Sequence, residues 1–211
     1  MKVAYIPSMR IILTFILLSS TITLAQPTTA PADPAVFVKA MRFSDADKTE
    51  KVTALTAEYQ KQLQAVLDQR QAALNSIGEA DKPEVDKQTV DAYRTCRSAA
   101  LALRDAYVAQ LNSLMTPFQV ERIKDGLTGD LYHHTVQLYD DMVPNLTHAQ
   151  RAHIAGLLTE MRENAMLETD PERQRKWAEK YRGILNNYIS KQGYDFKSLA
   201  KAYDEKKNAN E

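Results

Sequence analysis

Residues 44–78 read SDADKTEKVTALTAEYQKQLQAVLDQRQAALNSIG, and this stretch decides the fold. Two rows of side chains recur in it every seven positions: Val52, Tyr59, Val66 and Ala73 in the first, and Thr56, Leu63 and Ile77 in the second. Such a repeat predicts one long amphipathic helix that packs along a seam with another helix. Arg70 falls in the second row, where we expect it either to extend along the apolar surface or to meet a carboxylate. Ser44, with Asp47 three residues later, is the predicted N-cap, and Gly78 is the predicted end.

A second long helix is predicted over residues 81–115. Asp81 is suited to cap it, and Pro83 is suited to its first turn. Its apolar stripe is made by Tyr93, Cys96, Ala100, Leu103, Tyr107, Leu111 and Leu114. Because the connection between the two long helices is short, we expect them to pack as an antiparallel hairpin.

Shorter helices are predicted after the hairpin. Several begin at residues suited to cap a helix, namely Thr116, Thr147, Asp170 and Asp195. A further short helix is predicted over residues 136–142, whereas residues 128–134 are predicted to be irregular. No run of alternating apolar and polar residues indicates a strand, so the expected fold class is all-α: a long antiparallel helical hairpin packed with a C-terminal group of shorter helices. We expect a single domain over residues 35–205 and a frayed tail over residues 206–211.

The beginning of the chain is typical of a secretory signal peptide. Lys2 and Arg10 supply the basic region, an apolar run follows, and Thr23-Leu24-Ala25 fits the small-x-small cleavage pattern. We expect residues 1–25 to be removed and residues 26–34 to form a flexible tether. The mature protein is then expected to be exported, to the periplasm or outside the cell. No later apolar run has the length of a membrane span.

The charge of the chain is balanced. There are 27 basic and 27 acidic side chains, and removal of Lys2 and Arg10 changes the formal charge from 0 to −2. A nucleic-acid-binding protein would carry a basic excess, so we expect no nucleic-acid partner. Cys96 is the only cysteine, which excludes an intrachain disulfide, and its helical neighbours favour burial over an intermolecular bridge.

No motif for catalysis or metal binding is present. The sequence has no Gly-x-Ser-x-Gly, no His-Glu-x-x-His and no phosphate-binding glycine loop. Carboxylates for glycoside hydrolysis are available but unpaired in the sequence: Asp125, Asp130, Asp140, Asp141, Glu160 and Glu163. The histidines are spaced poorly for joint chelation, so we expect surface or capping roles for all of them: His133, His134, His148 and His153. We therefore expect a non-catalytic protein with no metal and no cofactor.

The segment Lys180–Asp195, KYRGILNNYISKQGYD, is the least ordinary helical stretch. Gly183, Asn186 and Asn187 together give up about 2 kcal/mol of helix propensity, and local choices of this kind mark either function or unusually close packing. One stripe of this helix is expected to be core: Trp177, Tyr181, Ile184, Leu185 and Tyr188. Arg182 and the two asparagines lie off that stripe, where they face water, a second neighbour or a ligand. The alternative to a ligand is that Gly183 permits a close helix crossing and the asparagines bond a neighbouring loop.

Two helix starts resemble a motif of known exported proteins. Met115-Thr-Pro-Phe-Gln119 and Leu146-Thr-His-Ala-Gln150 are similar to the LTxxQ pattern of Spy-like periplasmic stress chaperones, which are also helical hairpins. A capping box generates the same pattern without common ancestry. The resemblance implies an exposed apolar concave face on the hairpin and suppression of client aggregation.

A second resemblance covers residues 34–203. It is carried by segments in order: Lys124–Thr128, Tyr139–Thr147, Met161–Met166, Lys180–Tyr188 and Gly193–Asp195. Together they resemble a family of secreted bacterial proteins, domain-of-unknown-function family 3826. The resemblance implies a sugar-binding protein found beside polysaccharide-degrading enzymes, and it supplies no catalytic residues. It also implies a basic residue where this chain has Ile184.

The sequence thus favours an exported, non-catalytic helical domain that binds carbohydrate or assists polysaccharide utilisation. We expect the ligand-binding residues to be Arg182, Asn186, Asn187 and Tyr194, with Arg162 and Glu163 from the preceding helix. The alternatives are a Spy-like chaperone or envelope-stress protein, and a structural module that docks a partner.

Overall fold

The computed structural model describes residues 33–78 and 82–209. The predicted signal peptide, most of the predicted tether and the predicted cap Asp81 lie outside the described residues. The described part is all-α, as predicted, and contains no strand. Its helices are α1 (Pro34–Ala40), α2 (Ala46–Asn75), α3 (Lys82–Leu114), α4 (Pro117–Leu127), α5 (Leu131–Met142), α6 (His148–Ala165), α7 (Pro171–Lys191) and α8 (Phe196–Asn208). None of these helices combines the length and apolar composition needed to cross a bilayer.

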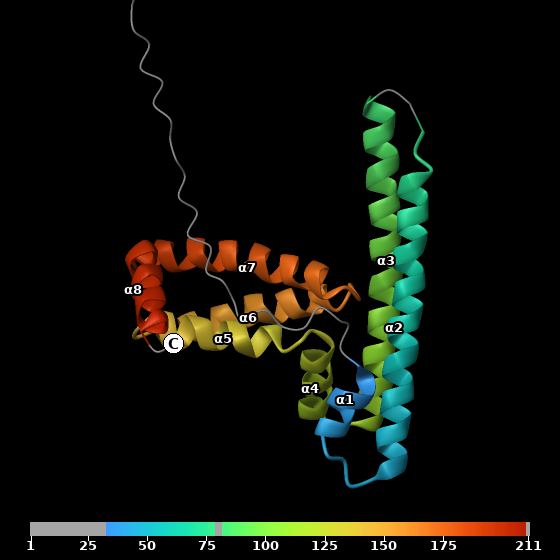
Figure 1. Ribbon diagram of the computed structural model, residues 1–211, viewed down its shortest axis with the longest axis horizontal. Coiled ribbons are helices and arrows are strands. Elements are labelled where there is room, and N and C mark those ends of the chain that lie inside the picture. Colours follow the sequence, from blue (N-terminus) through green and yellow to red (C-terminus); the bar gives the residue numbers. More distant parts are fainter. Residues whose placement is uncertain (1–32, 79–81, 210–211) are drawn as a thin grey trace, which may run out of the picture.

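Helices α2 and α3 lie antiparallel along each other (Figure 1). Their seam is closed by the rings of Tyr59 and Tyr107, which stack with centroids 4.4 Å apart, and by a 2.9 Å hydrogen bond between the hydroxyls of Tyr107 and Thr56. Of the two environments predicted for Arg70, an apolar surface or a carboxylate, the structure shows the carboxylate: the guanidinium lies 3.7 Å from Glu168. The heptad pattern therefore predicted the seam correctly in its first half, where the side chains are buried.

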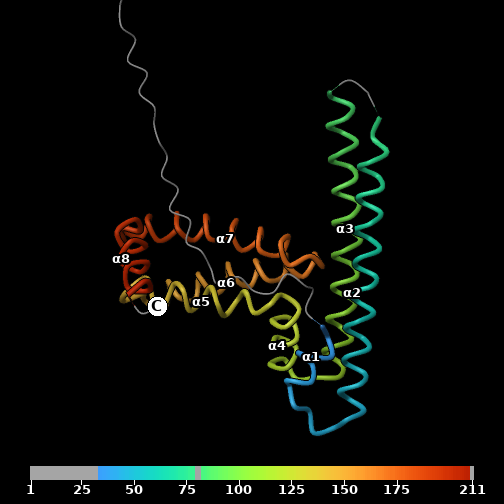
Figure 2. The backbone as a smooth tube through the Cα atoms, viewed as in Figure 1, coloured from blue at the N-terminus to red at the C-terminus, as the bar shows by residue number. Residues whose placement is uncertain are grey.

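The two halves of the hairpin differ in what covers them. Near the start of α2 the hairpin packs with α1 and α4, and at its middle it packs with the α6–α7 link, whereas its far end extends away from the remaining helices (Figure 2). Ala73 is exposed and Val66 and Ile77 are only partly buried, although they continue the predicted heptad rows. A two-helix segment without a third helix leaves part of its apolar seam in water.

The molecule has two apolar cores. The first lies between α2 and α3 and includes Val120 and Ile123 of α4, together with Met166 and Leu167 of the α6–α7 link. The second is formed by α5, α6, α7 and α8. The hydroxyl of Tyr59 donates a 2.7 Å hydrogen bond to the carbonyl oxygen of Met166, so the α6–α7 link is bonded directly into the hairpin.

Most predicted helix starts are confirmed by cap geometry. Thr116 and Thr147 each form a capping box, and Asp170 and Asp195 each accept a hydrogen bond from the first turn of their helix. The cap of α2 is Asp45, which accepts from the Lys48 N–H at 3.2 Å, so the prediction of Ser44 was wrong by one residue. A capping box is a local bonding pattern, and Asp45 offers a competing acceptor at the same spacing.

The start of α5 was also predicted wrongly. Residues 131–134 are helical, not irregular, and α5 begins at Leu131. Asp130, the residue before it, has a left-handed backbone (φ 59°) and makes no side-chain cap bond, and Gly129 is also left-handed (φ 61°). Without a cap signal, the sequence placed the helix start too late. At its other end the chain stays helical through Asn208, within the predicted frayed tail.

Candidate functional site

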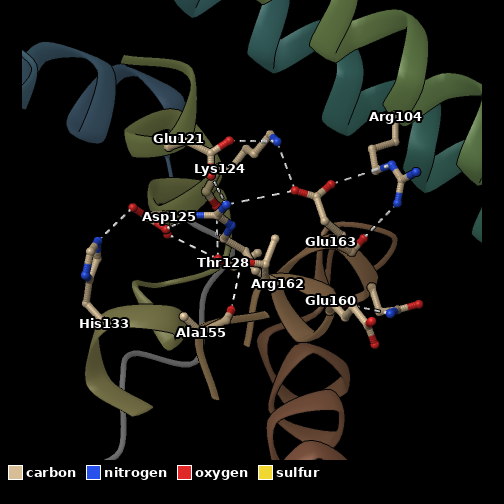
Figure 3. Close-up of polar contacts among 12 residues, drawn as sticks. Arg104, Glu121, Lys124, Asp125, Thr128, His133, Ala155, Glu160, Arg162 and Glu163 are labelled. Carbon is tan, nitrogen blue, oxygen red and sulfur yellow. Dashed lines mark hydrogen bonds and ion pairs between the residues drawn. The ribbon is translucent and has the colours of Figure 1, made fainter. Parts of the chain in front are cut away.

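A network of charged side chains lies between the two cores (Figure 3). At its centre is Arg162 of α6, whose side chain is only 3% exposed. Its guanidinium donates to the Asp125 carboxylate of α4 at 2.7 Å and also to Glu121 of the same helix. Burial alone would lower the pKa of Arg162, but its bonds with Asp125 and Glu121 outweigh burial and raise it. The guanidinium therefore stays charged and fixes α6 to α4.

The network continues from α6 to the hairpin. Glu163 accepts a 2.9 Å hydrogen bond from the ammonium group of Lys124, and its carboxylate lies 3.8 Å from Arg104 of α3. Arg104 also donates to the backbone carbonyl of Glu163 at 3.4 Å. Two residues predicted to line a ligand site, Arg162 and Glu163, thus form ion pairs that join α3, α4 and α6.

His133 adds a metal-like grouping at the edge of this network. Its Nε2 lies 3.0 Å from Asp125, and Asp125, Asp130 and His133 bring one ligand atom each within 4.8 Å of one another. Two arginines contact the same carboxylates: Arg162 bonds Asp125, and Arg122 lies 3.6 Å from Asp125 and 3.9 Å from Asp130. Each carboxylate thus already has a cationic partner, which disfavours a further cation. The sequence missed this grouping because His133 follows Asp125 across the left-handed turn at Gly129 rather than at a helical spacing.

One predicted binding residue of α7, Asn186, faces α5. The hydroxyl of Tyr139 donates to the Asn186 amide oxygen at 2.5 Å and to the Arg182 carbonyl at 3.3 Å. Burial raises the pKa of Tyr139, so its hydroxyl remains a donor. Of the three environments that the sequence left open for Asn186, the structure shows a second neighbour, and that neighbour is a helix rather than a loop.

Two further predicted residues lie at the solvent side of α7 and beyond its end. Asn187 is exposed, and Tyr194 approaches the α5–α6 connection, with its hydroxyl 3.4 Å from the Asn145 carbonyl and 3.3 Å from the Gln150 side chain. A Cβ added at Gly183 would meet no atom within 4 Å, so close helix packing does not explain this glycine. The close crossing suggested for Gly183 is therefore wrong.

An aromatic strip runs along the seam between α6 and α7. We define it by Trp177, Tyr181 and Tyr188 of α7 together with His153 of α6. Trp177 and Tyr188 are half-buried, and His153, whose ring centroid lies 4.2 Å from that of Tyr188, is exposed. Ile184, between them, is 40% exposed. The stripe that the sequence predicted to be core is thus only partly core, because the buried face of α7 is centred on Leu185 and runs through Ala178 and Ile189.

Polar groups accompany the strip. The hydroxyl of Tyr181 donates to Glu160 at 3.3 Å and accepts from the Asn164 amide at 3.2 Å. The Asn164 oxygen in turn accepts a 2.9 Å hydrogen bond from Arg97 of α3. Burial and the nearby Glu160 raise the pKa of Tyr181, which keeps the hydroxyl protonated. The strip therefore offers aromatic rings beside donors and acceptors.

A cavity of ligand size lies elsewhere, in the uncovered half of the hairpin. This hairpin groove has a volume of about 400 Å³ and is lined by Val66, Arg70 and Ala73 of α2, by Ile77 just beyond the end of α2, and by Ala92 and Cys96 of α3. Cys96 is buried, as predicted, and burial raises the pKa of its thiol. A second space of about 10 Å³ under the α6–α7 link holds at most a water molecule.

A known protein family matches most of the chain. Residues 30–209 match the family described as a protein of unknown function, DUF3826. The chain belongs to this family. No curated protein matches the chain. The family has no assigned activity, so membership identifies the relatives of the chain but not its function.

Proposed function

We propose that this DUF3826 protein is an exported, non-catalytic domain that binds carbohydrate, and that the aromatic strip is its binding surface. The observation that carries the proposal is the combination of half-exposed rings with adjacent polar groups along one seam. A pyranose ring has apolar C–H faces and a rim of hydroxyls, so it is recognised by rings that contact its face and polar groups that bond its rim. Trp177 and Tyr188 supply rings, while Glu160 and Asn164 supply an acceptor and an amide.

Two of the carboxylates that the sequence offers for glycoside hydrolysis have partners within the chain. Glu160 bonds Tyr181, and Glu163 is held by Lys124 and Arg104. A glycosidase needs two carboxyl groups that flank the scissile bond, one of them free to transfer a proton. Of the predicted binding residues, Tyr194 lies beside Gln150 in the first turn of α6. We retain Tyr194 as one end of the proposed binding surface.

Binding is tested by titrating the whole mature chain with soluble glycans in a calorimeter. We expect Trp177→Ala and Tyr188→Ala to weaken binding about tenfold each, the effect of losing an aromatic contact of ~1.4 kcal/mol. Phe118→Ala is the matched control, because Phe118 is an aromatic residue that is 74% exposed on α4, away from the strip. Flat titrations of the unmodified chain across neutral and acidic glycans would sink the proposal, as would equal losses in Phe118→Ala.

A second function is favoured by the hairpin groove. The resemblance to Spy-like chaperones implies an exposed apolar face on the hairpin, and Val90 and Tyr93 beside the groove are 52% and 51% exposed. We propose as the alternative that this groove binds apolar segments of other polypeptides. Ala92→Glu, which places a charge in the groove, is then expected to abolish suppression of client aggregation, whereas Ala102→Glu at an exposed site of α3 is not. Full aggregation of clients in the presence of the unmodified chain would exclude this alternative.

A further inference from the structure

Two cationic side chains lie over one ring of the aromatic strip. The ammonium group of Lys180 lies 4.8 Å from the centroid of the Trp177 ring, and the guanidinium carbon of Arg97 lies 5.9 Å from it. Lys180 comes from α7 and Arg97 from α3, so the two charges converge on Trp177 from different helices. Both side chains are exposed.

Neither cation is neutralised by a carboxylate. Arg97 donates to the neutral amide oxygen of Asn164, and among residues 33–78 and 82–209 neither Arg97 nor Lys180 forms an ion pair. Other arginines close by in the sequence do: Arg94 lies 2.9 Å from Asp91, and Arg173 lies 3.9 Å from Glu168. The Trp177 end of the strip therefore carries two positive charges without an ion-pair partner, in a chain whose formal charges balance as a whole.

We propose that this end of the strip recognises the carboxylate of a uronic acid, so that the preferred ligand is an acidic oligosaccharide. The inference rests on the proposed function and names its ligand class. Arginine has several N–H donors in a planar fork that matches a carboxylate, and only one contact of Arg97 is used within the chain.

The middle of the strip, at Tyr181, fixes the direction of the ligand. Glu160, which accepts from Tyr181, would repel a second carboxylate but accepts hydrogen bonds from hydroxyls. One uronate therefore lies at Trp177 between Arg97 and Lys180, and the hydroxyls of the following sugar lie toward Glu160. A ligand bound in this way gains affinity from a single charged site rather than from overall charge.

The experiment compares two ligands that differ only in charge: a short oligosaccharide in which one glucuronate is linked to neutral sugars, and the methyl ester of the same oligosaccharide. We expect the acid form to bind the mature chain about tenfold more tightly, the factor of one charge-assisted hydrogen bond of ~1.4 kcal/mol. The preference should shrink when salt is raised, because exposed charges are screened. Lys180→Gln and Arg97→Gln should each reduce the preference, because each should weaken binding of the acid more than binding of the ester. Lys51→Gln removes an exposed lysine near the start of α2 as the control for loss of one positive charge.

The outcomes separate this inference from the proposed function. Equal or tighter binding of the ester, or a preference that Lys180→Gln and Arg97→Gln do not reduce, overturns the acidic-sugar inference while carbohydrate binding stands. A preference that Lys51→Gln reduces equally also overturns it, because the effect would then come from overall charge. Absence of binding to either form and to neutral glycans overturns the proposed function as well.

Discussion

Replacing Arg162 by methionine tests whether the charge network holds the two cores together. The substitution keeps an unbranched apolar side chain and removes the guanidinium, which leaves the Asp125 oxygen without the donor that lies 2.7 Å away. Both side chains are 3% exposed, so water cannot replace the lost partner. Breaking a buried ion pair by removing one member costs about 3–5 kcal/mol, a large share of the ~5–15 kcal/mol that stabilises an ordinary domain.

A double-mutant cycle separates the pair from its surroundings. Arg162→Met, Asp125→Leu and the double variant would be unfolded in urea and followed by far-ultraviolet circular dichroism. We expect the double variant to be at least ~2 kcal/mol more stable than the sum of the single losses predicts, since two apolar side chains of similar volume can pack where the ion pair lay. Arg122→Met is the control, because Arg122 contacts the same carboxylate but is 43% exposed, and exposed pairs contribute about 1 kcal/mol or less.

Additive losses, or a cost for Arg162→Met no larger than that for Arg122→Met, would refute the reasoning. The pH dependence gives an independent check. Burial raises the pKa of Glu121, but bonds with Lys124 and Arg162 outweigh burial and lower it overall. A lowered pKa contributes stability above the pKa of the unfolded chain, about 4.3, and that contribution is lost as the pH falls through the lower value of the folded chain. Arg162→Met should reduce this loss at acid pH.

The remaining predictions concern the backbone, the caps and the buried tyrosines. Gly183→Ala should raise the free energy of unfolding by about 0.5–1 kcal/mol, because the site is helical and open, whereas Gly193→Ala, at φ 91°, should lower it by about 1–2 kcal/mol; urea titrations measure both. Thr147→Ala should cost about 1 kcal/mol through loss of its capping box, and Thr147→Ser should restore most of it. Burial raises the pKa of Tyr59, Tyr107 and Tyr139, so these side chains stay neutral in the folded chain at a pH where they ionise in the unfolded chain. Above pH ~10 the free energy of unfolding should therefore fall by about 4 kcal/mol per pH unit. Absorbance at alkaline pH should show that the three tyrosines ionise only when the chain unfolds.

The fold could be predicted from the sequence because it is set by local signals. Thr116 and Thr147 cap their helices through bonds to residues three positions away, and such bonds depend on little else. The same locality explains the misplaced start of α5: Asp130 precedes the helix in a left-handed conformation with no cap bond, so no sequence signal marks the boundary. The exposed heptad residue Ala73 shows the limit of periodicity, which indicates a face and not whether another element covers it.

The candidate site could not be predicted in the same way, because its contacts join distant positions. Arg162 meets Asp125 across 37 residues, and no spacing rule connects α6 with α4. Asn186 was correctly placed off the main stripe of α7, but only the structure shows that Tyr139 of α5 covers it. The position of Arg97 beside Trp177 likewise depends on how the hairpin meets α7, which is set by tertiary packing.

Asn164 links these parts, and its replacement by aspartate tests the charge argument without removing a cation. Its amide oxygen accepts from Arg97, while its nitrogen donates to the Glu160 carbonyl and the Tyr181 hydroxyl. Asn164→Asp keeps the shape and gives Arg97 an internal carboxylate partner, so preference for acid over esterified oligomers should fall by about tenfold if Arg97 reads the ligand charge. The variant also loses two donated hydrogen bonds, which should lower stability by about 1–2 kcal/mol, so binding must be measured where circular dichroism shows the chain fully folded. Unchanged preference in a folded Asn164→Asp variant would mean that Arg97 holds α3 against α6 and plays no part in ligand recognition.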